Sequence, residues 1–284
     1  MTQILAFGTL YLVGTPIGNL EDMTLRGIRT LKEVDLIAAE DTRHTGKLLH
    51  HLQIKTPQIS YHEHNQVERT AELIVKLRSG KTIALVSDAG MPSISDPGYL
   101  LVTEAIANSI PVVPIPGVSA GITALVASGL TSDRFVFEGF LPVKGRGRSD
   151  RLEAITQETR TIIFYESPHR LLATLQDLAR TFDENRGIVL ARELTKVHEE
   201  FWRGSLGEAI ALYTEKRQPK GEYTLIVNGA VPNTEITLSE DELKIELQQL
   251  LKQGMTRSQA SRQLAKLTTL SRREIYQLSM ESDL

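Results

Sequence analysis

The chain has 284 residues, of which 41% are hydrophobic and 24% charged, and its formal net charge is -3. This composition excludes a disordered polyelectrolyte, and no apolar run approaches the roughly 20 residues that cross a bilayer, so we expect no membrane partner. There is no cysteine, which excludes disulfides, thiolate zinc sites and a cysteine nucleophile and agrees with a cytoplasmic location.

The N-terminal half alternates short β-rich runs with longer amphipathic segments, the pattern of βαβ units around a largely parallel sheet. The apolar stretch Ile4 to Val13 has no basic leader and predicts a strand rather than a signal peptide. Residues 67–78 have helical spacing, with Gly80 as the stop. We expect one doubly wound domain over residues 1–128. Its expected strands are Leu10 to Val13, Val34 to Ala39, Gln58 to Tyr61, Thr82 to Val86 and Pro111 to Ile115.

A second series of β-rich runs begins near Arg134 and predicts a second α/β domain over residues 129–231. Its expected elements are strands Phe135 to Phe140, Thr161 to Tyr165, Gly187 to Ala191 and Tyr223 to Val227, and a helix from Pro168 to Arg180. The segment 141–148 is expected to be a flexible, glycine-rich basic loop that contacts phosphate, or else a solvated connection. The basic residues of this segment are Lys144, Arg146 and Arg148, and Arg151 follows it.

Residues 232–284 predict a small helical domain of three short helices. Each helix opens with a Ser or Thr that is followed three residues later by Glu or Gln, the capping-box pattern. The pairs are Ser239 with Glu242, Thr256 with Gln259 and Ser271 with Glu274, and the apolar faces comprise Leu243, Leu247, Leu250, Leu251, Ala260, Leu264 and Leu267. The pattern resembles a helix-turn-helix, and an excess of Lys and Arg favours a nucleic-acid partner; a plain helical bundle is an equal alternative. The basic residues are Lys252, Arg257, Arg262, Lys266, Arg272 and Arg273.

The chemistry is expected beyond the carboxyl ends of the strands, where open α/β sheets bind ligands. Segment 14–19, Gly-Thr-Pro-Ile-Gly-Asn, follows the first strand and is neither a dinucleotide fingerprint nor a P-loop. Segment 87–98 is a long loop with two aspartates, and loops of this kind are usually functional. A third element, 116–120, leads into an apolar helix and could present backbone amides to a polar ligand.

The strands of the second domain end in charged residues. Glu166 closes one strand, Ser167 is an expected N-cap, and Pro168, His169 and Arg170 follow as the first helical turn. Cations there oppose the helix dipole, which hints at an anionic ligand. Segment 192–196 is again dense in charge. His62 and His64 flank Glu63, but a structural zinc takes four ligands and no matching pair is evident, so we expect no metal.

Six motifs, in order along essentially the whole chain, resemble those of the tetrapyrrole-methylase superfamily, and more narrowly those of the bacterial 16S rRNA (cytidine 2'-O)-methyltransferase family. They occupy residues 13–20, 39–43, 87–98, 116–120, 165–170 and 193–196. The resemblance implies two α/β domains of the class III methyltransferase type, S-adenosyl-L-methionine between them, a homodimer, and a ribose hydroxyl of 16S rRNA or the 30S subunit as acceptor.

The resemblance also implies a set of site residues. The donor would contact Thr15, Pro16, Asp88, Ala89, Gly90, Ser93, Ile94, Ser119, Ala120, Tyr165 and Glu166. RNA would meet Glu40 to Arg43, His169, Arg170, Lys144, Arg146, Arg148 and Arg151.

Methyl transfer is an in-line displacement, so holding donor and hydroxyl together in a dry cleft supplies most of the catalysis. A base would help, and Glu166 and His169 are the candidates; equally, Glu166 orients the donor and His169 contacts phosphate. The alternatives are a methyltransferase of small tetrapyrroles and a non-enzymatic regulator that binds nucleic acid through its helical tail.

Overall fold

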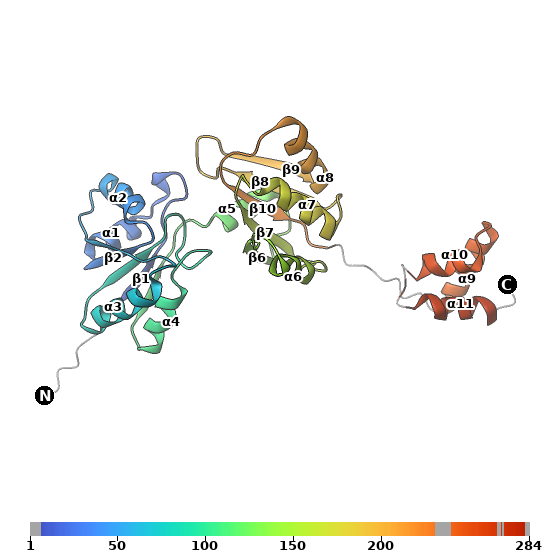
Figure 1. The fold of residues 1–284 in the computed structure, drawn as a ribbon, viewed down its shortest axis with the longest axis horizontal. Helices are drawn as coiled ribbons and strands as arrows, with labels where there is room; N and C mark the ends of the chain where they lie inside the picture. Colours follow the sequence, from blue (N-terminus) through green and yellow to red (C-terminus); the bar gives the residue numbers. More distant parts are fainter. Residues whose placement is uncertain (1–6, 231–239, 266–267, 269, 282–284) are drawn as a thin grey trace. The chain divides into compact units, whose positions relative to one another are not determined.

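The structure, a computed structural model, describes residues 7–230, 240–265, 268 and 270–281. The chain forms two compact units, Met1–Gly229 and Ala230–Leu284. Figure 1 shows the elements of each, coloured along the sequence. Within the described residues, every helix is too short or too polar to cross a lipid bilayer.

The first sheet has five parallel strands in the order β3-β2-β4-β1-β5. They are β1 (Leu10–Val13), β2 (Leu36–Ala39), β3 (Gln58–Ser60), β4 (Ile83–Val86) and β5 (Val112–Ile115). All residues of the central strand β4 are buried, as expected for a strand that helices cover on both faces. The prediction of a largely parallel sheet is confirmed.

Helices cover both faces of this sheet. They are α1 (Leu25–Glu33), α2 (Thr42–His51), α3 (Gln66–Arg78) and α4 (Tyr99–Ala107), with a short 3-10 turn, η1 (Leu20–Asp22). Because side chains alternate along a strand, Val13 packs in the core beneath α1 and α2, whereas Leu10 packs in the core beneath α3 and α4. Helix α3 ends where Gly80 takes a positive φ of 90°, as predicted. This doubly wound arrangement leaves the carboxyl ends of the strands uncovered by helices.

The second sheet is mixed, with the order β6-β7-β10-β8-β9. Only β6 and β7 are parallel; the other neighbours are antiparallel. The strands are β6 (Phe135–Phe140), β7 (Thr161–Glu166), β8 (Gly187–Arg192), β9 (Glu200–Ser205) and β10 (Tyr223–Val227). One face packs against α6 (Arg146–Ala154), α7 (Leu171–Phe182) and α8 (Leu206–Ala211), and η2 (Leu212–Lys216) continues α8.

Helix α5 (Ala120–Ser128) follows a strand of the first sheet but covers the other face of the second sheet. Its buried residues Ala124 and Leu125 pack with Ile163 of β7 and Ile226 of β10. The predicted boundary at residue 128 therefore separates α5 from the sheet that it covers.

Three local predictions are wrong. The basic loop around Arg146 is helix α6, and the helix expected to start at Pro168 starts at Leu171 with Arg170 as its N-cap. Ser167 does not cap it, because residues 167–170 form a turn in which the Arg170 amide donates to the Ser167 carbonyl at 3.2 Å. Strand β9 was not predicted; it pairs only with β8 at the sheet edge, and its residues are half-buried or exposed.

The C-terminal unit contains α9 (Glu240–Lys252), α10 (Arg257–Leu264) and α11 (Arg272–Glu281) around a small core that includes Leu243, Leu247 and Leu264. The capping box of Thr256 with Gln259 is confirmed. Ser271 and Glu274 also bond reciprocally, with the Ser271 amide donating to Glu274 at 2.7 Å. Ser239, Lys266 and Leu267 lie outside the described residues.

Candidate functional site

The loops after β1 and β4 bond to each other at the carboxyl edge of the first sheet. The Thr15 amide donates to the Gly90 carbonyl at 2.9 Å, and the Gly90 amide donates back at 3.0 Å. Gly14 and Gly117 approach so closely that a Cβ on Gly14 would lie 2.7 Å from the Cα of Gly117. Such an approach is open only to glycine, so these residues fix the shape of the strand-end loops.

A first cavity, with a volume of about 470 Å³, lies next to these loops and also reaches the second sheet. The site residues predicted from the resemblance that line it are Ala89, Gly90, Ile94, Ser119, Ala120, Tyr165 and Glu166. Residues that sequence reasoning did not select also line it, among them Asp96, Phe140 and Leu194. Most of the lining is apolar, and Asp96 supplies a titratable group.

A second cavity, of about 350 Å³, adjoins the first and shares Ile17, Ala89 and Glu222 with it. The predicted residues Thr15, Pro16 and Asp88 line this second cavity rather than the first. Its lining also includes Leu20, His44, Lys47, Leu48 and Lys196. The predicted donor residues are thus divided between two neighbouring cavities.

Ser93 lines neither of these cavities. Its Oγ is buried and has no hydrogen-bond partner among the described residues. Ser93, Ser95 and Gly98 all have positive φ values, of 71°, 61° and 148°. Such backbone is strained for serine and is maintained only where the surroundings enforce it, as often happens at ligand sites.

Three carboxylates gather beside the two cavities. The Asp88 amide donates to Oε2 of Glu40 at 3.2 Å, and Oδ1 of Asp88 accepts from the Asp41 amide at 3.1 Å. Burial raises the pKa of Asp96 to about 6, and the charge of Glu40 adds to the shift. Burial also raises the pKa of Glu40. The group creates a negative potential that favours a cationic ligand.

Tyr165 forms an aromatic wall of the first cavity. Its hydroxyl accepts a hydrogen bond from the Gly121 amide at 3.0 Å, and its ring makes edge contacts with Phe137 and Phe140 at 5.1 and 5.7 Å between centroids. Burial raises the pKa of Tyr165. Strand β7 thus fixes this ring against the first turn of α5.

The Glu166 carboxylate points away from that wall, because successive residues of a strand face opposite sides. Its side chain is only 1% exposed. Oε2 accepts from the Thr174 hydroxyl at 2.6 Å, Oε1 accepts from the Ser167 amide at 2.8 Å, and Arg170 lies 3.5 Å away. The base role expected for Glu166 does not fit, because its acceptor atoms are engaged inside the protein.

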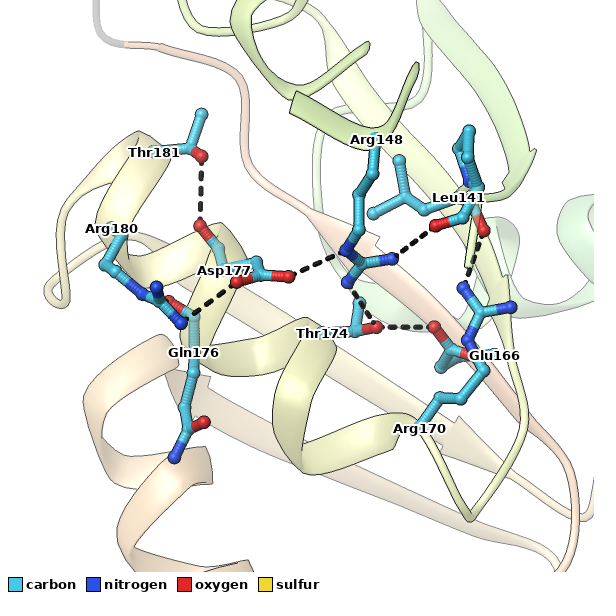
Figure 2. A network of polar contacts seen from close by, with 10 residues as sticks. Leu141, Arg148, Glu166, Arg170, Thr174, Gln176, Asp177, Arg180 and Thr181 are labelled. Carbon is cyan, nitrogen blue, oxygen red and sulfur yellow. Dashed lines mark hydrogen bonds and ion pairs between the residues drawn. The ribbon is translucent and has the colours of Figure 1, made fainter. Parts of the chain in front are cut away.

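Arg148 belongs to the same group, which we call the Arg148 network: Arg148, Glu166, Arg170, Thr174 and Asp177. Figure 2 shows the Arg148 guanidinium extending between the segment after β6 and helix α7. It donates to Asp177 at 2.7 Å, to the Pro142 carbonyl at 2.9 Å and to the Thr174 hydroxyl at 3.0 Å. The expectation that Arg148 meets RNA is therefore wrong for this structure: the residue is 8% exposed and its nitrogens are bonded internally.

The other residues predicted to contact RNA differ in their exposure and in their bonds to other protein groups. Lys144 and His169 are exposed. The Arg146 side chain is 93% exposed and lies 3.6 Å from the Asp150 carboxylate. The Arg43 side chain is 88% exposed and forms an ion pair with Asp41. Arg151 pairs with Glu138, whose side chain is buried, and Arg170 donates to the Leu141 carbonyl at 2.6 Å. Exposed cations such as Arg43 and Arg146 can exchange a weak surface pair for a phosphate.

Segment 193–199, between β8 and β9, makes a hydrogen bond to the loop after β1. The Asn19 amide donates to the Thr195 hydroxyl at 3.1 Å, and both Glu193 and Thr195 have positive φ. Lys196 donates to Glu222 at 2.7 Å and to Glu193 at 3.0 Å. Burial alone would lower the pKa of Lys196, but these two bonds raise it, so the ammonium remains charged.

Asp96, Lys47 and Glu222 are the clearest site residues that sequence reasoning missed. Asp96 lies in the loop already singled out, so its carboxylate carried a usable signal. Lys47 on α2 and Glu222 before β10 carried none, because only the fold brings them to the cavities. Among the described residues, no three His, Asp or Glu side chains are arranged so that they could hold a metal ion together.

Comparisons with known proteins agree with this geometry. Residues 9–210 match the family model of tetrapyrrole (corrin/porphyrin) methylases. A Synechocystis ribosomal RNA small subunit methyltransferase I is 60% identical over 274 residues, which covers 96% of this chain and 98% of the relative. A Pasteurella multocida protein of the same name is 44% identical and covers 96% and 97%.

Solved structures share the fold at low identity. A uroporphyrin-III C-methyltransferase from Thermus thermophilus, complexed with S-adenosyl homocysteine, has a TM-score of 0.55 and 20% identity and covers 78% of this chain and 97% of its own. A diphthine synthase has a TM-score of 0.62 and 14% identity, covering 95% and 100%.

Proposed function

The chain belongs to the family of tetrapyrrole (corrin/porphyrin) methylases, and from this membership we infer that it is an S-adenosylmethionine-dependent methyltransferase of small-subunit ribosomal RNA. The observation that carries the inference is the identity of 60% to a relative of that name over nearly the full length of both chains. The family's solved fold and the cavities at the strand ends agree with it.

We propose that the first cavity holds the donor. Its apolar lining suits the adenosine and the carbons beside the sulfonium, and the carboxylate of Asp96 in that lining complements a ligand that carries positive charge at its sulfonium and amino groups. The donor supplies a methyl group activated by the adjacent sulfonium. Tyr165 and the Thr15–Gly90 bridge hold the cavity walls in place, so a bound donor loses little further freedom.

As acceptor we propose the 2'-hydroxyl of a cytidine in the decoding region of 16S rRNA. The exposed cations Arg43, Lys144 and Arg146 are available to RNA phosphates. Neither candidate base is supported by geometry: Glu166 is enclosed, and His169 is exposed on the turn before α7 and lines neither cavity. We therefore propose that catalysis rests mainly on positioning and on exclusion of water.

We further propose a homodimer in the cytoplasm that uses no metal. Exposed apolar side chains on consecutive helices support the dimer: Tyr99 and Ile106 on α4 are 77% and 64% exposed, and Ile122 and Val126 on α5 are 45% and 73% exposed. Such apolar exposure is characteristic of association surfaces. Sedimentation analysis of the purified chain measures the oligomeric state directly.

Methyl transfer from a labelled donor distinguishes the candidate functions. We expect label in the RNA of 30S subunits that lack the modification, with the nucleotide identified by mass spectrometry. Label only in tetrapyrrole precursors would overturn the RNA assignment. Absence of donor binding by calorimetry would favour a non-enzymatic nucleic-acid-binding protein.

A further inference from the structure

We propose that the second cavity receives a single acceptor nucleotide, turned out of its RNA strand, and that Lys47 and Lys196 contact the phosphates beside it. The proposal rests on the RNA methyltransferase function proposed above and specifies where that function takes its substrate.

The position of the second cavity is what an acceptor site requires. Transfer by direct displacement needs the acceptor oxygen in line with and next to the methyl carbon, so the acceptor must occupy space that adjoins the donor, and the two cavities share Ile17, Ala89 and Glu222. Ile17 and Ala89 belong to the two loops that the Thr15–Gly90 bridge joins. The shared wall is therefore fixed before either ligand binds.

The charges of the two cavities differ in the direction that two such ligands demand. Asp96 lies in the lining of the first cavity, which suits a cationic donor. The second cavity has Lys47 and Lys196 in its lining, beside the carboxylates of Asp88 and Glu222, whereas the lining of the first cavity contains carboxylates and no Lys or Arg. Lys196 is held by Glu222, whose side chain is 77% exposed, so a phosphate can replace that carboxylate at little cost. Cations at this border favour the polyanionic backbone of RNA.

The size and the walls of the second cavity fit one nucleotide. A volume of about 350 Å³ is in the range of small-molecule sites and too small for a base-paired stem. Leu20, Leu48 and Pro16 provide apolar surface for a base, and Asp88 provides a carboxylate that can accept from a ribose hydroxyl. Enzymes that modify nucleotides commonly turn the target out of its stack into such a pocket.

Filling the second cavity without touching the first is the most direct test. Leu20 is 43% exposed at the second cavity and does not line the first, so Leu20→Trp narrows the proposed acceptor site with little risk to folding. We expect kcat/KM for 30S subunits to fall at least roughly tenfold while the donor Kd stays within about twofold. The matched control is Leu25→Trp, at a residue that is 86% exposed on α1 and lines neither cavity.

Substitutions that remove or keep a positive charge test the proposed phosphate contacts. Lys47→Ala should weaken binding of an RNA fragment, measured by fluorescence anisotropy with S-adenosyl homocysteine present, and should reduce the slope of log K against log salt by about 0.7. Lys47→Arg, which keeps the positive charge, should retain most of the RNA affinity and most of the salt slope of the wild type. Lys32→Ala, an equal change of charge on α1 at a residue that lines neither cavity, should change neither.

Two outcomes overturn the proposal. One is unchanged RNA kinetics in Leu20→Trp together with an unchanged salt slope in Lys47→Ala. The other is a loss of donor affinity in Leu20→Trp, which would place the donor in the second cavity. Either requires that the wild-type chain methylates 30S subunits. A wild-type chain that does not do so refutes the proposed function instead, so the two failures are distinguishable.

Discussion

The strand-end loops of the first sheet and the Arg148 network of the second sheet are both dense in charged residues, yet they use these residues in opposite ways. The loop after β4 directs Asp88 to the second cavity and Asp96 to the first. In the Arg148 network, Arg148 donates to Asp177 and to the Thr174 hydroxyl, which in turn donates to Glu166, so these bonds link β7 to α7. Charged residues that follow a strand therefore mark a ligand site only where no other group of the protein pairs with their side chains.

The largest expected effect comes from breaking the Arg148 network. Arg148→Ala leaves Asp177 and Thr174 without their buried partner, so we expect the free energy of unfolding to fall by about 3 kcal/mol in urea denaturation. Arg146→Ala, two residues away but 93% exposed, should change it by less than about 0.5 kcal/mol. Equal effects of the two substitutions would show that the network is not a structural unit.

An intermediate effect is expected at Asp96, on the ligand side of the comparison. A cationic donor favours the ionised carboxylate, so donor binding should release protons near pH 6 and should strengthen as the pH rises through that value. If the donor lowers the pKa of Asp96 by about one unit, the affinity gain is about tenfold. Calorimetry in buffers of different ionisation enthalpy measures the protons released; an unaltered signal in Asp96→Asn would contradict this role.

The same residue provides a check on stability. The folded-state pKa of Asp96, about 6, lies above its ordinary value of 3.8, so its ionisation opposes folding and stability is lost as the pH rises through that interval. Asp96→Asn should therefore unfold at a higher temperature than the wild type at pH 8 and show a smaller difference at pH 4. A lower Tm at pH 8 would argue that Asp96 is a structural residue.

The smallest expected effect concerns the exposed cations. Arg43→Ala should leave the free energy of unfolding within about 0.5 kcal/mol, because its pair with Asp41 lies at the surface. It should reduce the salt slope of RNA binding by about 0.7 if it contacts a phosphate. An unchanged salt slope would show that Arg43 is a solvated surface residue that does not contact RNA phosphate.

Sequence patterns predicted the strands of both sheets well, because their apolar runs end at glycine, proline or charge. They failed at β9, whose sequence Glu-Phe-Trp-Arg-Gly-Ser mixes polar and aromatic residues as an edge strand can. They also failed at α6, where the glycines beside Arg146 indicated a loop. Most of the donor residues implied by the resemblance reach a cavity.

The side chains of the second sheet were the least predictable. Tyr165 and Glu166 both line the first cavity, but alternation along a strand implies that their side chains lie on opposite faces of the sheet. Which partners each side chain meets depends on the helices that cover each face: Tyr165 meets α5 and Glu166 meets α7. Burial of Arg148 had no signal in the sequence, since its partners Thr174 and Asp177 lie on a helix 26 and 29 residues further along the chain.

The packing of α5 has a practical consequence for anyone who wishes to express the two α/β halves separately. A cut after residue 128 would leave α5 attached to the first sheet, with Ala124 and Leu125 in water and Ile163 and Ile226 uncovered on the other fragment. A cut between Ile115 and Gly117 would keep the helix with its sheet but would separate Gly117 from Gly14. Either fragment pair would have to reassemble before a donor could bind, which makes split-protein complementation a natural reporter of donor-site assembly.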